Sequence, residues 1–226
     1  MSTGRGFRTF ACWLTTLLLG LGLAVLLAPP LPWKAVIIAV ILAPYAITES
    51  SGIVMWRYMF EPDVGMVAHL LGRLGMGQLD WSTNPVETLL LASTIAIWHH
   101  LPFTFLILYS ALTTVPRDVL EASEIDGASR WQQFRLITLR LILPAILIAV
   151  LFRYIFAIRT FAEVWLLTEG GPARLSEILA IYLYREMFKY HQFGMASATG
   201  CFMLVMSIII ALPYLRRMYR EVIRGA

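Results

Sequence analysis

Four ionisable side chains interrupt otherwise apolar stretches of this chain: Glu49, Arg153, Arg159 and Glu163. A charged group at the centre of a bilayer costs about 2.5–3.5 kcal/mol on insertion scales, so each one requires a partner or a watery cavity. Arg159 and Glu163 are spaced to share a helix face and to neutralise each other. Arg153 is expected to extend toward the nearer membrane surface. These groups therefore either pair among themselves or line a path for a polar solute.

Aromatic rings beside a few polar groups are typical of sites that bind polar organic solutes. The residues predicted to line such a pathway are Glu49, Trp98, Tyr154, Arg159 and Glu163. Packing between membrane helices is the alternative role for the aromatic members of this set. The adjacent His99 and His100 point about 100° apart on a helix and so form no metal pair by themselves. The sequence predicts no catalytic residue, no metal site and no cofactor.

A second informative stretch is EASEIDGASRWQQFRLITLRLILP, which begins at Glu121. Its apolar residues recur at every third position from Ala122 to Phe134, a spacing that drifts around a helix of 3.6 residues per turn. Gly127 can adopt a positive φ angle and turn the chain there. The stretch therefore predicts two short helices that insert into a groove on a partner. An amphipathic connector lying on the lipid headgroups is the alternative.

The composition indicates a membrane protein. Of the 226 residues, 59% are hydrophobic and only 14% are charged, against about 25% charged residues in an ordinary soluble domain. The mean hydropathy is +0.73. The net charge of +4 comes from Lys and Arg beside apolar runs, so it favours contact with a membrane surface rather than with nucleic acid.

The long apolar runs predict an all-α integral membrane protein with five transmembrane helices in one domain, residues 1–226. A helix needs about 20 apolar residues to cross the hydrocarbon. The runs are Phe10–Ala28, Ala35–Trp56, Val86–Leu112, Leu141–Leu167 and Ala196–Leu215. A slight excess of Lys and Arg on one side places the loop at residues 113–140 and the C-terminus in the cytoplasm.

The stretch from Glu121 resembles the cytoplasmic coupling loop of ATP-binding cassette importer permeases. That family carries EAA, three residues, Gly, nine residues, Ile, any residue, then Leu-Pro. The matching positions here are Glu121, Ala122, Ser123, Asp126, Gly127, Ile137 and Leu139. The resemblance implies a helix-turn-helix at residues 113–140 that contacts the ATPase. Arg140 stands where the family has Pro.

The resemblance extends over most of the chain and implies the partners. PYAITESSGIVMWRYMFEPDVG, LLTEGGP and FGMASATG look like flanking segments of the permeases of maltose, glycerol 3-phosphate and trehalose importers. The family implies a cassette ATPase dimer, a second homologous permease and an extracytoplasmic solute-binding protein, all at a bacterial or archaeal cytoplasmic membrane. Its core has six spans, so the first one has no counterpart here. A naturally short form and a truncated sequence both explain this.

Two other classes of membrane protein remain as alternatives. A secondary transporter would couple solute movement to ions through Glu49 and Glu163, but it leaves the spacing around Gly127 unexplained. A membrane-embedded enzyme would need clustered His, Asp or Glu at a bilayer surface, and the sequence shows no such cluster. A GxxxxGK[ST] phosphate loop is absent from the chain. The expected energy source is therefore ATP hydrolysis by another subunit, with solute passing inward by alternating access.

Overall fold

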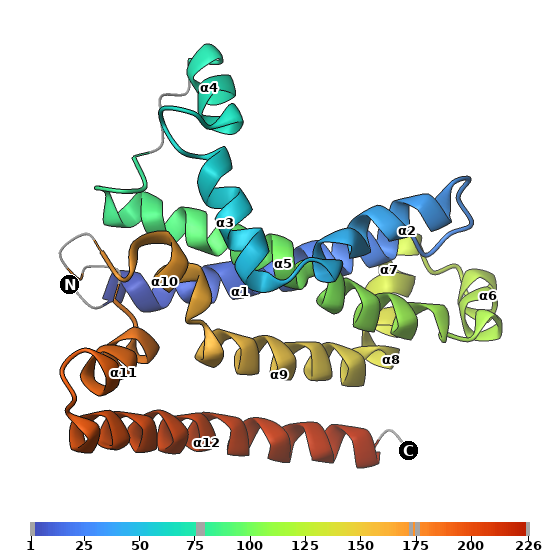
Figure 1. Cartoon of the computed structure of the whole chain (residues 1–226). Coiled ribbons are helices and arrows are strands. Elements are labelled where there is room, and N and C mark those ends of the chain that lie inside the picture. The colour runs from blue at the N-terminus through green and yellow to red at the C-terminus, as the bar shows by residue number, and fades with distance from the viewer. Residues whose placement is uncertain (1–2, 76–79, 172–173, 175–176, 225–226) are drawn as a thin grey trace.

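The computed structural model describes the backbone of residues 3–75, 80–171, 174 and 177–224 and the side chains of residues 14–75, 80–158, 160–171, 174 and 177–220. Helices dominate this part (Figure 1). The long ones are α1 (Thr3–Leu26), α5 (Pro85–Thr113), α9 (Leu143–Arg159) and α12 (Phe193–Arg224). The short ones are α2 (Lys34–Leu42), the 3₁₀ turn η1 (Ala43–Ala46), α3 (Glu49–Met59), α4 (Met66–Arg73), α6 (Arg117–Ile125), α7 (Arg130–Gln132), the π-helical turn η2 (Gln133–Thr138), α8 (Leu139–Leu141), α10 (Ala162–Thr168) and α11 (Leu179–Phe188).

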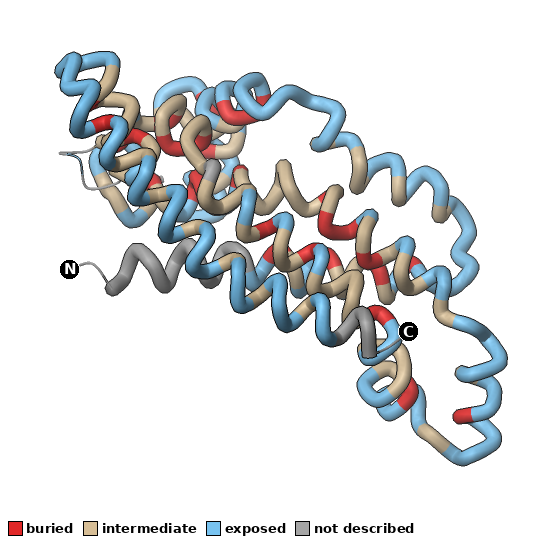
Figure 2. The backbone as a smooth tube through the Cα atoms, turned by 90° about the horizontal axis from the view of Figure 1, so that it is seen from below, coloured by how far each residue is buried: buried red, intermediate tan, exposed pale blue. Residues whose placement is uncertain are grey.

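The four long helices lie side by side and form the body of the molecule (Figure 1). α1 packs closely on α5, and α9 contacts α1, α5 and α12. Close approach of α1 and α5 depends on Gly20, since a Cβ built there would lie 3.0 Å from Thr104 Cγ2. Small residues bring membrane helices together in this way. Buried residues gather in the middle of the bundle, whereas α12 is mostly exposed (Figure 2).

Three helical segments in the described part are long and apolar enough to cross a membrane: Pro85–Thr113, Leu143–Thr168 and Phe193–Arg220. These correspond to the last three predicted spans. The described side chains of α1 begin at Leu14, and the stretch from there to Leu26 is apolar but covers only part of the helix. The count of five spans therefore stays a prediction.

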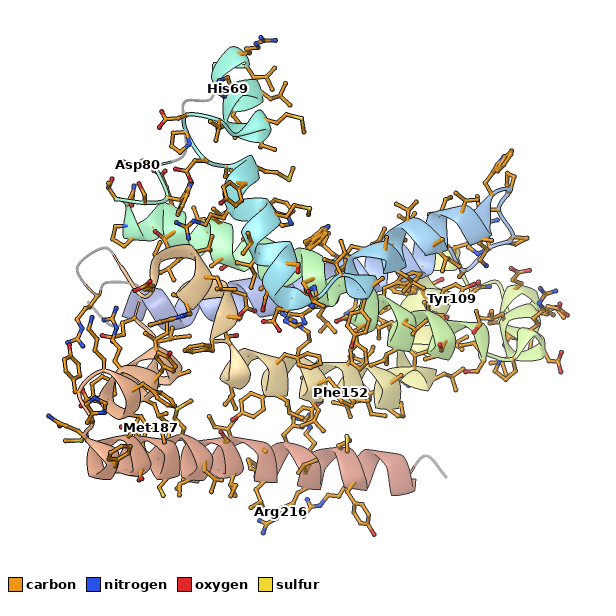
Figure 3. All side chains as sticks on the ribbon, viewed as in Figure 1. His69, Asp80, Tyr109, Phe152, Met187 and Arg216 are labelled. Carbon is orange, nitrogen blue, oxygen red and sulfur yellow. The ribbon has the colours of Figure 1, made fainter. Side chains whose placement is uncertain are left out.

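The predicted span over Ala35–Trp56 is bent in the structure. The segments Lys34–Ala46 and Glu49–Met59 meet at an angle of 98°. Pro44 opens the 3₁₀ turn, and Ile47 is extended, with ψ 136°. Proline cannot donate a backbone hydrogen bond, and the polar run Thr48–Ser51 ends the apolar pattern. The first helical segment therefore ends at Ala46, and α3 begins at Glu49 in another direction. α3 and α4 consequently project from the bundle as an arm whose far end carries His69 (Figure 3).

Arg153 is buried rather than extended toward the membrane surface. Its side chain is only 4% exposed, and its Nη2 donates to Thr16 Oγ1 at 3.4 Å. The expectation that it snorkels is therefore wrong. Packing of α9 against α1 encloses the guanidinium between two apolar helices, where Thr16 supplies a hydrogen-bond acceptor.

Candidate functional site

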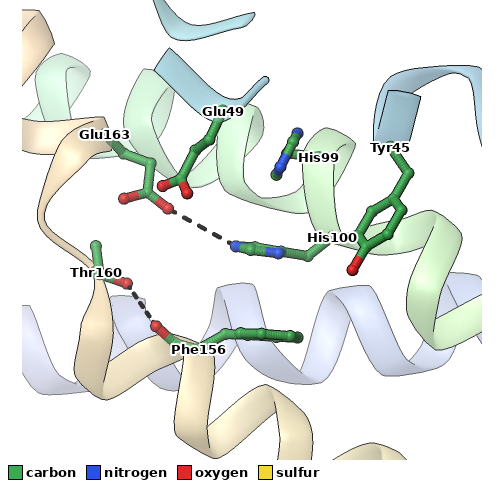
Figure 4. A pocket seen from close by; sticks show the side chains of 7 residues that line it. All are labelled: Tyr45, Glu49, His99, His100, Phe156, Thr160 and Glu163. Carbon is green, nitrogen blue, oxygen red and sulfur yellow. Dashed lines mark hydrogen bonds and ion pairs between the residues drawn. The ribbon is translucent and has the colours of Figure 1, made fainter. Parts of the chain in front are cut away.

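A polar cavity of about 260 Å³ lies where the break between η1 and α3 faces α5 and the end of α9 (Figure 4). Its lining side chains come from three separate parts of the chain: Tyr45, Glu49, His99, His100, Thr160 and Glu163, with the ring of Phe156 beside them. Two carboxylates and two imidazoles therefore meet inside a bundle of apolar helices. The described residues contain no group of three or more His, Cys, Asp or Glu arranged to hold a metal ion.

Two interruptions in membrane helices bring these groups together. The first is the bend before α3, which places Glu49 at the start of that helix. The second lies between α9 and α10, where Thr160 has ψ 115° and Phe161 has φ −143°. α10 then packs on α3, and Arg57 Nη1 donates to the carbonyl of Leu166 at 3.0 Å. Broken helices at membrane depth are tolerated where the irregular backbone is buried in protein or lines a water-filled cavity.

Glu163 is the most buried acidic group of the cavity. Only 3% of the residue is exposed. Its Oε1 lies 3.8 Å from His100 Nε2, and its Oε2 has no hydrogen-bond partner among the described residues. The His100 ring stacks on Phe156 with centroids 4.9 Å apart and planes inclined by 7°. His99 Nδ1, also buried, has no hydrogen-bond partner in the described part of the chain either. The cavity thus presents polar atoms that are still able to bond to a ligand.

The structure brings together two of the predicted pathway residues, Glu49 and Glu163. Trp98 instead packs edge-on against Trp56, with centroids 5.7 Å apart. Tyr154 donates its hydroxyl hydrogen to the carbonyl of Ser207 on α12 at 3.3 Å. The side chain of Arg159 lies outside the described residues.

The helix that was expected to carry both Arg159 and Glu163 is interrupted between them, since α9 ends at Arg159 and α10 begins at Ala162. Because the side chain of Arg159 lies outside the described residues, its pairing with Glu163 stays a prediction. Among the described residues, the imidazole of His100 lies beside Glu163.

Sequence reasoning missed His99, His100, Tyr45 and Thr160. It considered the two histidines only as a metal pair and set them aside because neighbours on a helix diverge. The signal that was available is their position within an apolar stretch, since polar groups inside membrane helices face a cavity or the bundle interior. No sequence signal pointed to Thr160, because its role follows from the break between α9 and α10.

At another place, the stretch from Glu121 forms two helical segments with a turn between them. α6 ends with a Schellman hydrogen-bond pattern, in which Ala128 N donates to the carbonyl of Ser123 and Gly127 N to that of Glu124, both at 3.0 Å. Gly127 has the predicted positive φ, 80°. Ser129 then caps α7: its Oγ accepts from Gln132 N at 3.4 Å, and its own N donates to Gln132 Oε1 at 2.8 Å.

The surface of this turn combines acidic and apolar groups. Of the residues that match the family motif, Glu121, Ala122, Asp126 and Gly127 are exposed, Ser123 is buried, and Ile137 and Leu139 are half-buried. Beside them, Ile125 is 87% exposed and Trp131 is 66% exposed. Arg140 lies inside α8, and α9 begins two residues after α8 ends at Leu141. Single exposed apolar residues are common, but a group on a short protruding turn is typical of an interaction surface.

The turn shares one end of the bundle with the start of α2, with α8 and with the C-terminal end of α12, whereas the start of α1 lies at the opposite end (Figure 1). Described basic side chains at this end are Lys34, Arg117, Arg130, Arg135, Arg140, Arg216, Arg217 and Arg220. Arg216 points away from the bundle (Figure 3). Basic residues flanking membrane spans are most abundant on the cytoplasmic side.

Comparison with known proteins places this architecture among transport proteins. The family described as "Binding-protein-dependent transport system inner membrane component" matches residues 6–222. The chain is 31% identical over 202 residues to a probable ABC transporter permease of Brucella suis biovar 1, covering 88% of this chain and 70% of that protein. It is 32% identical over 200 residues to the sulfoquinovosyl glycerol transport system permease of Agrobacterium fabrum, covering 88% and 65%.

Further similarity is found to a trehalose/maltose transport system permease of Thermococcus litoralis, with 29% identity over 199 residues, 88% of this chain and 67% of that protein. Among solved structures, a bacterial ABC transporter involved in the import of the acidic polysaccharide alginate superposes with a TM-score of 0.83 and 21% sequence identity. That superposition covers 94% of this chain and 77% of the other. At this identity the likeness shows a shared fold.

Proposed function

Because the chain belongs to the family of inner membrane components of binding-protein-dependent transport systems, we propose that it forms half of a solute pathway in an ATP-binding cassette importer. It is a multi-pass permease subunit of the cytoplasmic membrane and not an enzyme. In the proposed bacterial or archaeal assembly, a cassette ATPase dimer hydrolyses ATP. A second homologous permease completes the pathway, and an extracytoplasmic solute-binding protein delivers the solute.

The observation that carries the proposed coupling to an ATPase is the exposed turn at Gly127. It combines the family's residue spacing with a helix-turn-helix geometry and with the exposed side chains of Glu121 and Ile125. The basic residues at the same end of the bundle support a cytoplasmic position. An amphipathic connector would lay its apolar side chains on lipid, whereas an ATPase groove would enclose α6 from several sides.

The chain order explains how movement of this turn would reach the solute. α5 leads directly into α6, and α8 leads directly into α9. α5 carries His100 and α9 carries Phe156, which stack on each other in the cavity. Closure of the ATPase dimer would pull the turn and shift α5 relative to α9, so the cavity would change shape between outward and inward access. Such shifts occur because packed helices have discrete alternative arrangements.

A carbohydrate or related polar solute is the proposed cargo. Polar groups and aromatic rings line the cavity together, as expected for a site that holds hydroxyl groups and sugar rings. The sugar permeases among the relatives support the same class. A secondary, ion-coupled transporter would use Glu49 and Glu163 instead, but the family match supports the importer.

Affinity purification from detergent-solubilised membranes tests the assembly. We expect a cassette ATPase and a second permease to co-purify with the unaltered chain. Glu121→Ala and Ile125→Glu should reduce the amount of ATPase recovered at least tenfold while the second permease is retained. Asp63→Ala, a change of an exposed carboxylate before α4, is the matched control and should leave recovery unchanged.

Two outcomes would overturn the proposal. If the unaltered chain purifies without any ATPase, it does not act in a cassette importer. If the ATPase remains bound at the same level in both variants, the turn at Gly127 is not its docking site.

A further inference from the structure

We infer that the second permease packs on the exposed surface around the bend between α2 and α3, so that the cavity closes between the two subunits, while α12 faces lipid. The inference rests on the proposed function and names the surface through which this chain meets that partner. The bend surface consists of exposed residues on α2, in the bend and on α3: Val36, Val40, Tyr45, Ile47, Ser51, Val54 and Met55.

The first support is exposed irregular backbone inside a membrane-embedded segment. Lys34–Ala46 and Glu49–Met59 are together long and apolar enough to cross a membrane, although they meet at 98°. All residues from Tyr45 to Ser51 are exposed in the single chain. Irregular backbone does not face lipid in the hydrocarbon region, because its N–H and C=O groups would have no hydrogen-bond partner there. The bend must therefore be covered by protein or line water.

The second support is the polar start of α3. A helix provides no acceptor of its own for its first amide groups. The side chain of Thr48 does not cap those of α3, because its Oγ1 donates to Ser51 Oγ at 2.8 Å. Ser50 and Ser51 line a shallow hollow together with Val54 and Met55. Serine hydroxyls form hydrogen bonds across helix interfaces in membranes. This mixture of polar and apolar groups suits another membrane protein better than lipid chains.

The surface of α12 differs in both respects. It is also largely exposed (Figure 2), but the helix is continuous over Phe193–Arg224. Every exposed residue from Phe202 to Leu215 is apolar. A continuous helix satisfies its own backbone hydrogen bonds, so such a surface can contact hydrocarbon directly. Of these two exposed surfaces, only the bend surface requires a protein partner.

The third support is the position of the cavity. Tyr45 lines it, yet 51% of this residue is exposed, so the cavity borders the bend surface. Lipid on this side would exclude a polar solute, whereas a second permease would supply the missing wall. A water-soluble solute-binding protein does not fit, because the bend lies within a segment that crosses the membrane. The pathway would then run between the two permeases.

Photo-crosslinking in membranes that contain the full assembly tests this assignment. The photoreactive residue p-benzoylphenylalanine is introduced at Met55 on α3 or, in a second variant, at Val40 on α2. Ile209, exposed on α12, is the matched control position. On irradiation the ketone abstracts a hydrogen atom from a neighbouring C–H bond, and the two carbon radicals join. Adducts are purified through a tag on this chain and identified by mass spectrometry.

We expect Met55 and Val40 to yield an adduct with the second permease, at least fivefold more than Ile209. The products expected at Ile209 are lipid adducts. Because the two test positions lie on different helices, one variant that fails to accumulate in the membrane does not decide the matter.

Three results would overturn the inference. The second permease could cross-link through Ile209 as well as or better than through the bend surface. Met55 and Val40 could yield only lipid adducts. Their adducts could contain the solute-binding protein or another copy of this chain. If the second permease co-purifies but does not cross-link at the bend surface, the inference fails and the importer stands. If no second permease co-purifies, the proposed function fails and the inference fails with it.

Discussion

His100 Nε2 lies 3.8 Å from Glu163 Oε1, although the two residues are far apart in the sequence and belong to α5 and α10. The distance is longer than a direct hydrogen bond of 2.7–3.2 Å. A water molecule or a ligand group can bridge atoms separated in this way. The pair therefore closes one side of the cavity while leaving both groups able to bond to a solute.

Removing the imidazole should destabilise the protein. His100→Ala removes the ring that stacks on Phe156, and such ring pairs contribute about 0.5–1.5 kcal/mol. His100→Gln keeps more of the side-chain volume and a polar group near Glu163, so it should cost less. Thermal unfolding of the detergent-purified protein, followed by tryptophan fluorescence, measures both. His69→Ala, exposed on α4, is the control. Equal melting temperatures for His100→Ala and the unaltered protein would show that the pair contributes nothing.

The backbone at Gly127 should be sensitive to side-chain type. Its φ of 80° is disfavoured for ordinary L-residues by about 1–2 kcal/mol, but Asn tolerates this region. A Cβ there meets no other atom within 4 Å, so the effect is conformational and not steric crowding. We expect Gly127→Val to leave the chain in the membrane but to uncouple ATP hydrolysis from uptake.

Gly127→Asn is the matched control and should retain coupling. Solute uptake and ATPase activity of the reconstituted assembly measure both variants. Normal uptake by Gly127→Val would argue strongly against a role of this turn in coupling.

Gly20 and Gly22 provide a test of the packing between α1 and α5. A Cβ at Gly20 would lie 3.0 Å from Thr104 Cγ2, whereas one at Gly22 meets nothing within 4 Å. Gly20→Leu should therefore lower stability by about 1–3 kcal/mol through overpacking. Gly22→Leu, in the same helix, should have little effect. The same thermal unfolding assay compares them, and similar losses for both variants would mean that α1 and α5 do not approach closely at Gly20.

Two tyrosines tie α12 to α9. The hydroxyl of Tyr154 donates to the carbonyl of Ser207, and that of Tyr214 donates to the carbonyl of Leu147. Each such bond contributes about 0.5–1.5 kcal/mol. The double variant Tyr154→Phe with Tyr214→Phe should therefore lose about 1–3 kcal/mol in a denaturant titration. Tyr219→Phe, at an exposed position, should lose nothing. An unchanged midpoint for the double variant would show that these bonds do not hold α12 in place.

Local patterns predicted the turn at Gly127 well because its geometry depends on neighbouring residues. The positive φ and the two flanking helices follow from a glycine between a run of helix formers and a Ser-x-x-Gln capping box. The apolar composition likewise predicted a helical membrane protein. These features need only contacts within a few residues.

The candidate cavity was harder to predict because breaks in two helices create it. A continuous helix over Ala35–Trp56 and a shared face for Arg159 and Glu163 both assumed that an apolar run stays straight. Whether a run bends depends on which neighbouring helices can satisfy the freed backbone groups. That information is not contained in hydropathy.

The sequence by itself determined that the chain is a helical membrane protein and which family it belongs to. The apolar runs and the spacing from Glu121 to Leu139, which carry this information, are local properties of the chain. Only the tertiary structure decided that Glu49, His100 and Glu163 meet in one cavity. It also decided that Trp98 and Tyr154 pack on other helices. The physical reason is that bends in α2–α3 and α9–α10 set the direction of these side chains, and packing between distant helices fixes the bends.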